Sequence, residues 1–357
     1  MTLRDVARKA GYHYSTVSLA LRNDPRINGK TREKILHVAR GIDYTPDPLT
    51  RALAIYRTSL KQATYHATLA WLSNADPSLL NPKYIGRRYA QGARQRAAEL
   101  GYKLEEFRLN ESGTTVHNLP KILRSRGING ILVAPRHHDQ RQTEIHMDWS
   151  LFPAVTFGYS LAWPLLHLVT NYHHGSVKIA LRELIQLGYK RIGLIVDKVG
   201  NDRVDGNWVG GYMAEVIKQE LEPLIFLRYC GNAMTLLVEQ EVPKLKAWLK
   251  KTRPDALIID YSAPFIDWLN RACGLRVPED IGVVSLNVDS SVQSGIDQNE
   301  HEIGATAVDL LVSLIHTNER GIPAIARRVL IEGTWRLGKT VSTVRLGREL
   351  QRYRRCQ

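Results

Sequence analysis

The chain has 357 residues, which is enough for roughly two or three domains, and its 44% hydrophobic and 24% charged residues are typical of a globular protein. This composition excludes a chain that is disordered throughout, and no apolar run is long enough for a membrane helix. The net charge of +14 lies mainly at the ends: residues 1–57 carry 11 Lys and Arg against 5 Asp and Glu, and residues 321–357 carry 9 against 2. Two basic ends favour a polyanion partner, although we interpret the carboxyl-terminal charge as a solubilising surface.

The first 43 residues predict three short helices. Thr2, followed three residues later by Asp5, resembles a capping box, so the first helix should begin near Leu3. A break at residues 23–25 ends the second helix, and Asn28 is a natural N-cap for the third. The predicted bounds are Leu3 to Gly11, about Tyr14 to Arg22, and Gly29 to Ile42.

Two short helices around a tight turn, with a third packed across them, form a helix-turn-helix, although this spacing also fits any small three-helix bundle. In the first interpretation the second helix reads DNA, because hydroxyl-bearing and small side chains can approach bases and phosphates. Its side chains predicted to face the major groove are Tyr14, Ser15, Thr16, Ser18 and Leu19. Three residues at helix starts, where N–H groups point outward, are predicted to lie near phosphates: Thr2, Asn28 and Thr31.

Residues 44–58 predict a hinge. Pro46-Asp47-Pro48 resets the chain, and the next residues can form a helix of only two turns, which is marginal alone. Arg51 beside Leu53 fits a wedge inserted into the minor groove of DNA. The alternatives are an ordinary linker, or a Leu53 that packs only within a pair of hinge helices.

From residue 67 onward, buried strands alternate with amphipathic helices, a pattern that predicts open parallel sheets covered by helices on both faces. The clearest helix runs from Ser176 to Leu187 and ends at Gly188. About 280 residues favour two such lobes over one. The fold class is therefore α/β, with an all-α head before a two-lobed sensor. The predicted strands include Ala67–Leu72, Gly130–Ala134, Ile192–Val196, Ala256–Ile259 and Gly282–Leu286.

In open α/β sheets, ligands bind beyond the carboxyl ends of the strands. From the first lobe this rule selects Ser73, Asn74 and Arg136. From the second lobe it selects Asn171, Trp208, Asp260 and Asn287. For Asn74 and Arg136, an ordinary polar loop position is an equal alternative.

The segment "TLRDVARKAGYHYSTVSLALRNDPRINGKTREKILHVARGIDYTPDPLTRALA" closely resembles the DNA-binding head of the lactose-repressor (LacI/GalR) family. Its D-V-A-x-x-A-G, S-T-V-S, K-T-R-E-K-I and Y-x-P motifs all stand in place. The segments "GSVKIALRELIQLGYKRIGLI" and "GLRVPEDIGVVSLNVD" extend the resemblance into the body, and it continues through residue 345. What it implies is a homodimeric transcriptional regulator with two heads in successive major grooves and two hinge helices paired in the minor groove. It also implies a sensor like periplasmic sugar-binding proteins, with two lobes joined by three crossovers around a ligand cleft.

The sequence departs from the family at positions that are expected to determine which operator and which effector bind. The family often has arginine where this chain has Leu19, so the usual operator sequence is not implied. Family members place an effector-clamping arginine where this chain has Trp208, which offers a stacking face or simply fills the cleft. The ligand of well-known relatives is therefore not implied. Three further positions also differ from the family: Asn171, Asp260-Tyr261 and Asn287.

Enzyme and metal signals are poor. The chain has neither a G-x-x-x-x-G-K-[ST] nor a G-x-S-x-G motif. Three widely spaced cysteines make no disulfide framework, and no apolar block follows the charged amino terminus, so we expect a cytoplasmic protein without a secretory signal. Neighbours on a strand point to opposite faces, so two adjacent histidine pairs form no chelate there: His137-His138 and His173-His174. No cofactor and no metal are expected.

These observations predict a DNA-binding transcriptional regulator, a repressor, that binds a near-palindromic operator as a homodimer and responds to a small effector, of carbohydrate type in one interpretation. The predicted domains are a head with hinge helix over residues 1–58, a two-lobed effector and dimerisation domain over 59–345, and a basic tail over 346–357. The alternative is a cleft-type carbohydrate-binding protein or enzyme with an incidental DNA-binding head.

Overall fold

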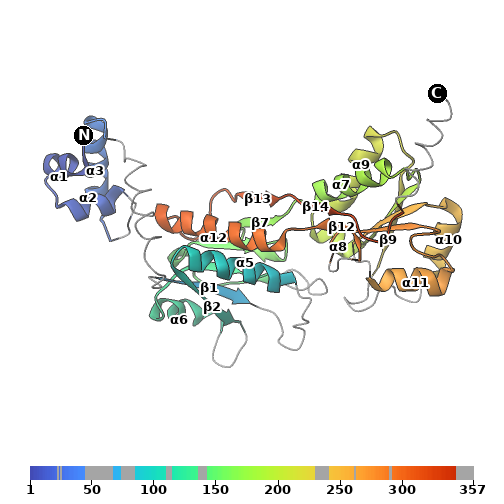
Figure 1. Cartoon of the computed structure of the whole chain (residues 1–357). Helices are drawn as coiled ribbons and strands as arrows, with labels where there is room; N and C mark the ends of the chain where they lie inside the picture. Colours follow the sequence, from blue (N-terminus) through green and yellow to red (C-terminus); the bar gives the residue numbers. More distant parts are fainter. Residues whose placement is uncertain are drawn as a thin grey trace.

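A computed structural model describes residues 1–21, 24, 26–44, 67–73, 85–109, 115–135, 143–229, 241–260, 263–288 and 292–342 (Figure 1). Within these ranges the chain forms a helical head and two α/β lobes. The predicted hinge helix, with Arg51 and Leu53, lies outside the described residues, as do the domain boundaries predicted near residues 58 and 345. None of the described helices is both long enough and apolar enough to cross a bilayer.

The head consists, in its described part, of α1 (Leu3–Ala10), α2 (Tyr14–Leu21) and α3 (Gly29–Gly41). The predicted capping box is confirmed: the Thr2 side chain accepts from the Asp5 N–H, and the Asp5 carboxylate accepts from the Thr2 N–H. The predicted cap of α3 is also confirmed, because Asn28 Oδ1 accepts from the Lys30 N–H at 3.0 Å. One small core joins the three helices; its buried members are Val6, Ala7, Ala10, Val17, Ala20, Ile35 and Ala39.

Lobe one is built on a parallel sheet that has six strands in the described part of the chain, in the order β13-β7-β5-β3-β1-β2. Helices α5 (Ile85–Glu99) and α12 (Glu300–Thr317) share a core with one face of the sheet, and α6 (Leu119–Ser125) shares a core with the other. A two-stranded sheet of β4 (Thr143–Glu144) and β6 (Leu161–Trp163) and the short 3-10 helix η2 (Trp149–Leu151) complete it. The main strands are β1 (Ala67–Ser73), β2 (Tyr102–Arg108), β3 (Ile128–Val133), β5 (Ala154–Phe157), β7 (His167–Asn171) and β13 (Arg328–Ile331).

Lobe two is built on a second sheet, in the order β14-β12-β11-β10-β8-β9, whose pairs are parallel except for the edge strand β14. Its strands are β8 (Ile192–Asp197), β9 (Leu224–Arg228), β10 (Ala256–Ile259), β11 (Gly282–Ser285), β12 (Ser294–Asp297) and β14 (Thr334–Arg336). Its helices are α7 (His173–Gln186), α8 (Lys198–Arg203), α9 (Asn207–Lys218), α10 (Val242–Thr252) and α11 (Ala263–Cys273). Helices α7 and α9 share one core and α10 and α11 the other, so helices cover both faces.

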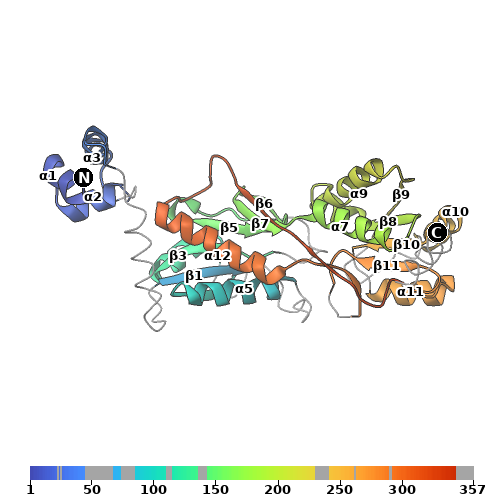
Figure 2. The same ribbon diagram turned by 45° about the horizontal axis from the view of Figure 1, so that its top comes forward.

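The chain passes between the lobes three times, as the resemblance implied. It leaves lobe one between β7 and α7, returns between β12 and α12, and leaves again between β13 and β14. Figure 2 shows the last of these passages as the red segment that runs from lobe one to lobe two. Because both sheets are interleaved in sequence, neither lobe is made from one continuous piece of chain.

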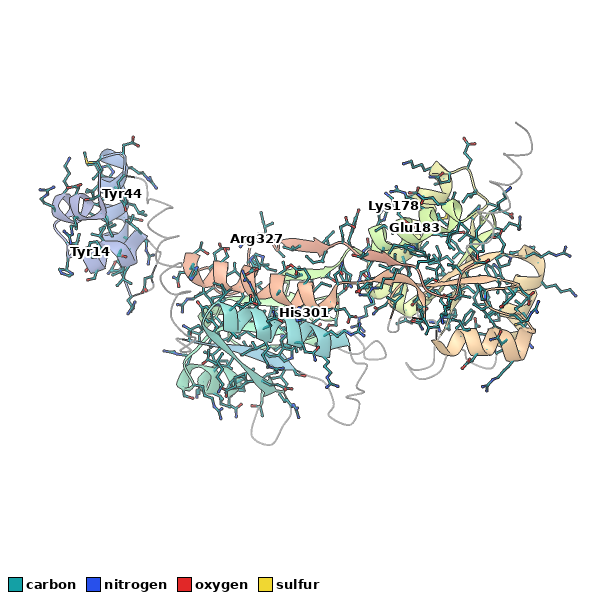
Figure 3. All side chains as sticks on the ribbon, viewed as in Figure 1. Tyr14, Tyr44, Lys178, Glu183, His301 and Arg327 are labelled. Atoms are coloured by element: carbon teal, nitrogen blue, oxygen red, sulfur yellow. The ribbon has the colours of Figure 1, made fainter. Side chains whose placement is uncertain are left out.

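Glycines set the closest helix contacts of both lobes. In lobe one, a Cβ added at Gly92 of α5 would lie 1.9 Å from the carbonyl oxygen of His301 on α12, which Figure 3 labels. A Cβ at Gly304 would lie 2.1 Å from the carbonyl oxygen of Tyr89. In lobe two, a Cβ at Gly211 of α9 would lie 2.4 Å from the carbonyl oxygen of His174. At each of these points backbone packs directly on backbone, which leaves no side chain that could move aside.

The predicted strands are confirmed, with their ends moved by at most two residues. The predicted helix face is confirmed as well, because Ala180, Leu181, Leu184 and Leu187 are all buried. That helix begins at His173, three residues earlier than predicted. The premise that His173 and His174 lie on a strand is therefore wrong, because they form the first turn of α7. The other pair, His137-His138, lies outside the described residues.

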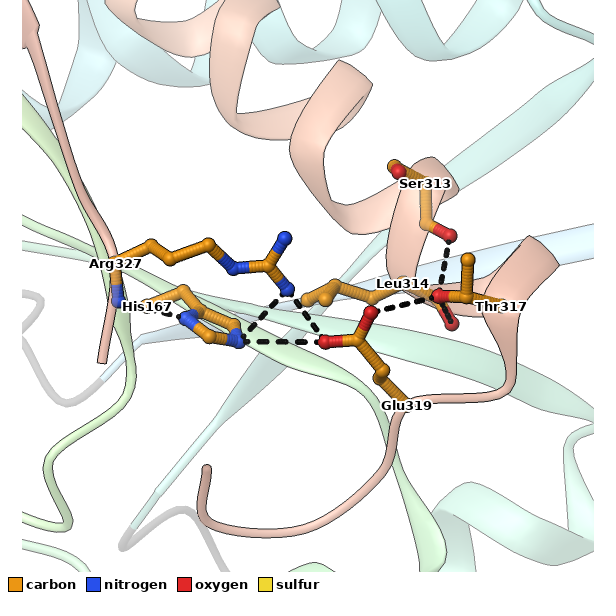
Figure 4. Close-up of polar contacts among 6 residues, drawn as sticks. All are labelled: His167, Ser313, Leu314, Thr317, Glu319 and Arg327. Atoms are coloured by element: carbon orange, nitrogen blue, oxygen red, sulfur yellow. Dashed lines mark hydrogen bonds and ion pairs between the residues drawn. The ribbon is translucent and has the colours of Figure 1, made fainter. Parts of the chain in front are cut away.

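A buried histidine of β7 holds the residue that precedes β13. Nδ1 of His167 accepts from the backbone N–H of Arg327 at 3.0 Å, so the neutral ring carries its proton on Nε2 (Figure 4). Nε2 lies 4.0 Å from Oε2 of Glu319, which is beyond hydrogen-bond distance, and 3.3 Å from Nη2 of Arg327, which donates to that oxygen. Burial lowers the pKa of His167, and the Arg327 charge lowers it further against the opposing effect of Glu319.

We expect the free energy of unfolding to fall as the pH drops below about 6.5, the ordinary pKa of histidine. The folded state keeps His167 neutral to lower pH than the unfolded chain does, so protons bind preferentially to the unfolded state. Urea titrations measure the free energy of unfolding at pH 7.5 and at pH 5. Between these two pH values it should drop less for His167→Gln, whose amide oxygen can still accept from Arg327, than for the wild type. Equal drops for wild type and His167→Gln would contradict this assignment.

Candidate functional site

The second helix of the head presents a neutral, hydroxyl-rich surface. Val17 and Ala20 are buried in the head core, while Tyr14 is 50% exposed and Ser15 is exposed beside it (Figure 3). The three other side chains predicted to face DNA are partly exposed: Thr16, Ser18 and Leu19. The predicted surface of α2 is thus accessible, whereas its contact with DNA stays a prediction.

The three predicted phosphate contacts all lie at helix starts. Thr2 caps α1 and Asn28 caps α3, and both side chains are exposed. Thr31 lies in the first turn of α3 and is partly exposed. Nearby, Nη2 of Arg32 donates to the carbonyl oxygens of Asp24 and Ile27, so this arginine fixes the segment before α3.

Asn171 ends β7 and lies in a buried network at the first crossover. The prediction that Asn171 comes from the second lobe is wrong, because β7 belongs to the sheet of lobe one and the chain crosses to lobe two only after it. Oδ1 of Asn171 accepts from the Tyr89 hydroxyl at 2.7 Å, and its Nδ2 donates to Oε1 of Gln298 at 3.0 Å. Gln298 belongs to the second crossover; its Oε1 also accepts from Ser176 Oγ, and its Nε2 donates to the Leu286 carbonyl of lobe two. One network therefore joins lobe one, lobe two and two of the passages between them.

Asp260 follows β10 and forms part of a buried ion pair. Its carboxylate pairs with Arg228 at the end of β9, and the side chains are 10% and 8% exposed. The other carboxylate oxygen accepts from the Asp197 N–H at 2.9 Å. Both oxygens of Asp260 thus hold three adjacent strand ends of lobe two in register.

Asn287 follows β11 and connects lobe two to the start of α12. Its Nδ2 donates to Oε1 of Glu300 at 3.1 Å, and Arg88 of α5 lies 3.3 Å from the other oxygen. Burial raises the pKa of Glu300, while the hydrogen bond from Asn287 and the charge of Arg88 oppose that rise. An open pocket of about 330 Å³ lies here, lined by Arg88, Asp297, Asn299, Glu300, His301 and Glu302.

Trp208 lies in the first turn of α9 and contacts the first crossover. Its indole meets the His173 ring edge-on, with centroids 5.7 Å apart, and His173 lies 6.1 Å from the Tyr159 ring of lobe one. The indole Nε1 is buried and has no acceptor among the described residues. Arg328 of lobe one lies over Tyr159 and pairs with Asp205 of lobe two at 3.7 Å. An aromatic row therefore runs from one lobe to the other.

Among the described residues, four predicted effector residues lie at or just after strand ends and Trp208 lies at a helix start, whereas their contact with an effector stays a prediction. Ser73 is the buried last residue of β1, whereas Asn74 and Arg136 lie outside the described residues. Sequence reasoning missed the residues that Asn171, Asn287 and Trp208 contact. Gln298 and Glu300 could have been found, because they directly follow β12, but nothing in the sequence shows that Tyr89 and Tyr159 reach the crossovers.

Two sequence families match separate parts of the chain. The profile described as "Bacterial regulatory proteins, lacI family" matches residues 2–47, and that of the "Periplasmic binding protein-like domain" matches residues 181–341. The lactose operon repressor of Escherichia coli is 23% identical over 327 residues, covering 88% of this chain and 84% of that protein. Catabolite control protein A of Streptococcus mutans is 24% identical, covering 89% of this chain and 92% of that protein.

Two solved structures of regulatory proteins are similar to this chain in fold. A lac repressor dimer bound to operator and the anti-inducer ONPF has a TM-score of 0.55 at 19% identity, over 96% of this chain and 99% of that one. A complex of the transcriptional regulator CelR with cellobiose has a TM-score of 0.53 at 19% identity, over 95% and 99%.

The head and the two interleaved lobes together define a regulatory protein in which a helix-turn-helix precedes a periplasmic-binding-protein-like domain. The chain thus joins a head that matches the lacI family of bacterial regulatory proteins to a domain that matches the periplasmic-binding-protein-like family.

Proposed function

We propose that this protein is a sequence-specific DNA-binding repressor of transcription that acts in the cytoplasm as a homodimer on a near-palindromic operator. The observation that carries the proposal is α2, a short helix held by a buried core with an exposed, hydroxyl-rich outer face. The match of residues 2–47 to the lacI family of bacterial regulatory proteins supports it, and the lac repressor of similar fold is a dimer bound to operator. The relatives it matches are transcriptional regulators, and we propose no catalytic role.

The proposed contacts divide by chemistry. Exposed groups of α2 read base edges in the major groove, because base edges, unlike phosphates, differ from one sequence to another. Thr2, Asn28 and Thr31 bind phosphates, which positions each head without selecting a sequence. Arg51 and Leu53 act in the minor groove between the heads, where an inserted leucine partly unstacks one base step.

Selection of bound sequences from random duplexes tests this function, and two variants separate its parts. Wild type should enrich a near-palindromic sequence. Tyr14→Ala should change the preferred bases, whereas Thr31→Ala should weaken binding to all sequences alike, by about threefold to tenfold for one lost hydrogen bond. The absence of any enriched sequence for wild type would reject the function, and unchanged affinity and preference for Tyr14→Ala would reject the assignment of α2.

We further propose that a small effector binds between the lobes against Trp208, together with Ser73, Asn74 and Arg136. The indole offers a ring face for stacking and a buried N–H that lacks an acceptor among the described residues. These features suit a sugar ring, which has apolar faces and many hydroxyl acceptors. The CelR regulator of similar fold was solved with cellobiose. In this proposal Asn171, Asp260 and Asn287 act indirectly, by holding the surrounding protein groups in place, since their side chains already bond to protein groups.

Titration with a panel of carbohydrates, followed by calorimetry, tests the effector proposal. We expect one of them to bind the wild type, and Trp208→Ala to weaken that binding by about tenfold or more, because stacking and the indole donor are both lost. Trp268→Ala is the matched control, since Trp268 packs on Phe265 of α11. Equal losses in the two variants, or no loss in Trp208→Ala, would argue against the indole as a ligand contact.

A further inference from the structure

The residue before the reading helix carries a side chain that bonds into the helix. The carbonyl oxygen of His13 accepts from the Val17 N–H at 3.2 Å, which makes His13 the N-cap of α2. Its ring atom Nδ1 accepts from the Ser15 N–H at 3.3 Å and lies 2.8 Å from Ser15 Oγ. The ring therefore does the capping that a short oxygen-bearing side chain usually does.

This geometry fixes where the hydrogens lie. A backbone N–H can only donate, so Nδ1 must hold a lone pair, and the neutral ring carries its proton on Nε2. The bond between Nδ1 and Ser15 Oγ then has one allowed direction, in which the serine hydroxyl donates to the ring. The single Ser15 proton points toward the His13 ring, so Ser15 has only oxygen lone pairs left for a bound base.

We propose that His13 determines the base specificity of Ser15 by fixing its hydroxyl as an acceptor. A serine hydroxyl alone can donate or accept and therefore distinguishes bases poorly. With its proton held by His13, Ser15 bonds only to a donor. In the major groove the donors are the amino groups of adenine and cytosine. This inference rests on the proposed DNA-binding function, and it assigns His13 a positioning role through Ser15.

Parallel selections from random duplexes with the full-length protein at pH 8, where histidine side chains are ordinarily neutral, test the inference. Ser15→Ala identifies the base pair that Ser15 reads, because preference is lost only there. Wild type should prefer adenine or cytosine at that position. His13→Ala should keep specific binding but accept guanine and thymine there, reducing the preference by about threefold to tenfold, the equivalent of one hydrogen bond.

Two further variants keep the test decisive if His13→Ala binds too weakly to select. His13→Asn supplies an amide oxygen that can cap α2 and take the Ser15 proton, so it should retain the preference for adenine or cytosine. His37→Ala removes an exposed histidine of α3 and should change nothing at this position. Guanine or thymine preferred by wild type or by His13→Asn, an unchanged preference in His13→Ala, or no position affected by Ser15→Ala would overturn the inference. Failure of wild type to enrich any sequence would instead reject the DNA-binding function itself.

Discussion

Gly92→Ala is expected to lower the free energy of unfolding of lobe one by about 3 kcal/mol, the upper part of the range for overpacked cores. The new methyl would lie 1.9 Å from the His301 carbonyl oxygen, so α5 and α12 must move apart. Alanine gains about 1 kcal/mol over glycine in helix propensity, which offsets only part of this cost. Urea or thermal unfolding of the full chain, followed by circular dichroism, measures the change.

Gly210→Ala in α9 is the matched control. Gly210 is exposed, and an added Cβ would meet only Nδ1 of His174 at 3.9 Å, which is an ordinary contact. This variant should be neutral or slightly stabilising, because only the propensity change remains. Its neighbour Gly211→Ala should behave like Gly92→Ala, since its Cβ would lie 2.4 Å from the His174 carbonyl. Equal effects at Gly210 and Gly211 would mean that helix propensity, not close backbone contact, determines these costs.

Those two neighbouring glycines also show what sequence reasoning could predict. Strands, helix faces and caps follow from local periodicity and composition, so the capping box at Thr2 and the buried face of α7 were predicted correctly. The difference between Gly210 and Gly211 depends on another helix, α7, which local patterns do not place. The first turn of α7 was missed for a related reason, because His173 and His174 are not apolar and extend the helix beyond its periodic stripe.

The candidate site was predictable in position but not in chemistry. The rule that ligands lie beyond strand ends found Asn171, Asp260 and Asn287 at strand ends, where the structure also has them. Their partners are distant in sequence: Asn171 bonds to Gln298, 127 residues away, and Asp260 to Arg228, 32 residues away. No local pattern encodes such pairs, so side chains expected to meet a ligand turned out to bond to protein. The exposed surface of α2 was easier to predict, because one short helix contains all of it.

Asn171→Leu should lower the free energy of unfolding by about 2–4 kcal/mol, because it removes the buried partner of two groups at once. The Tyr89 hydroxyl and Gln298 Oε1 each lose the hydrogen bond that Asn171 makes with them. Tyr89→Phe removes a hydroxyl from the same network and should cost less, about 1 kcal/mol. The measurement is chemical unfolding of the full chain at neutral pH.

The double variant decides whether Asn171 acts through this network. If it does, Tyr89→Phe with Asn171→Leu should cost less than the sum of the single variants, because both changes remove the same hydrogen bond between Tyr89 and Asn171. A coupling of about 1 kcal/mol or more is expected for groups in direct contact. An Asn171 whose main role is to bind effector predicts the opposite pattern: unchanged stability, additive effects and lost ligand binding. The buried position of Asn171, with its amide oxygen on lobe one and its amide nitrogen on the second crossover, favours the network. Effector binding would then change the arrangement of the two lobes through the crossovers that Asn171 joins, because a ligand shifts the equilibrium toward the arrangement that it binds more tightly.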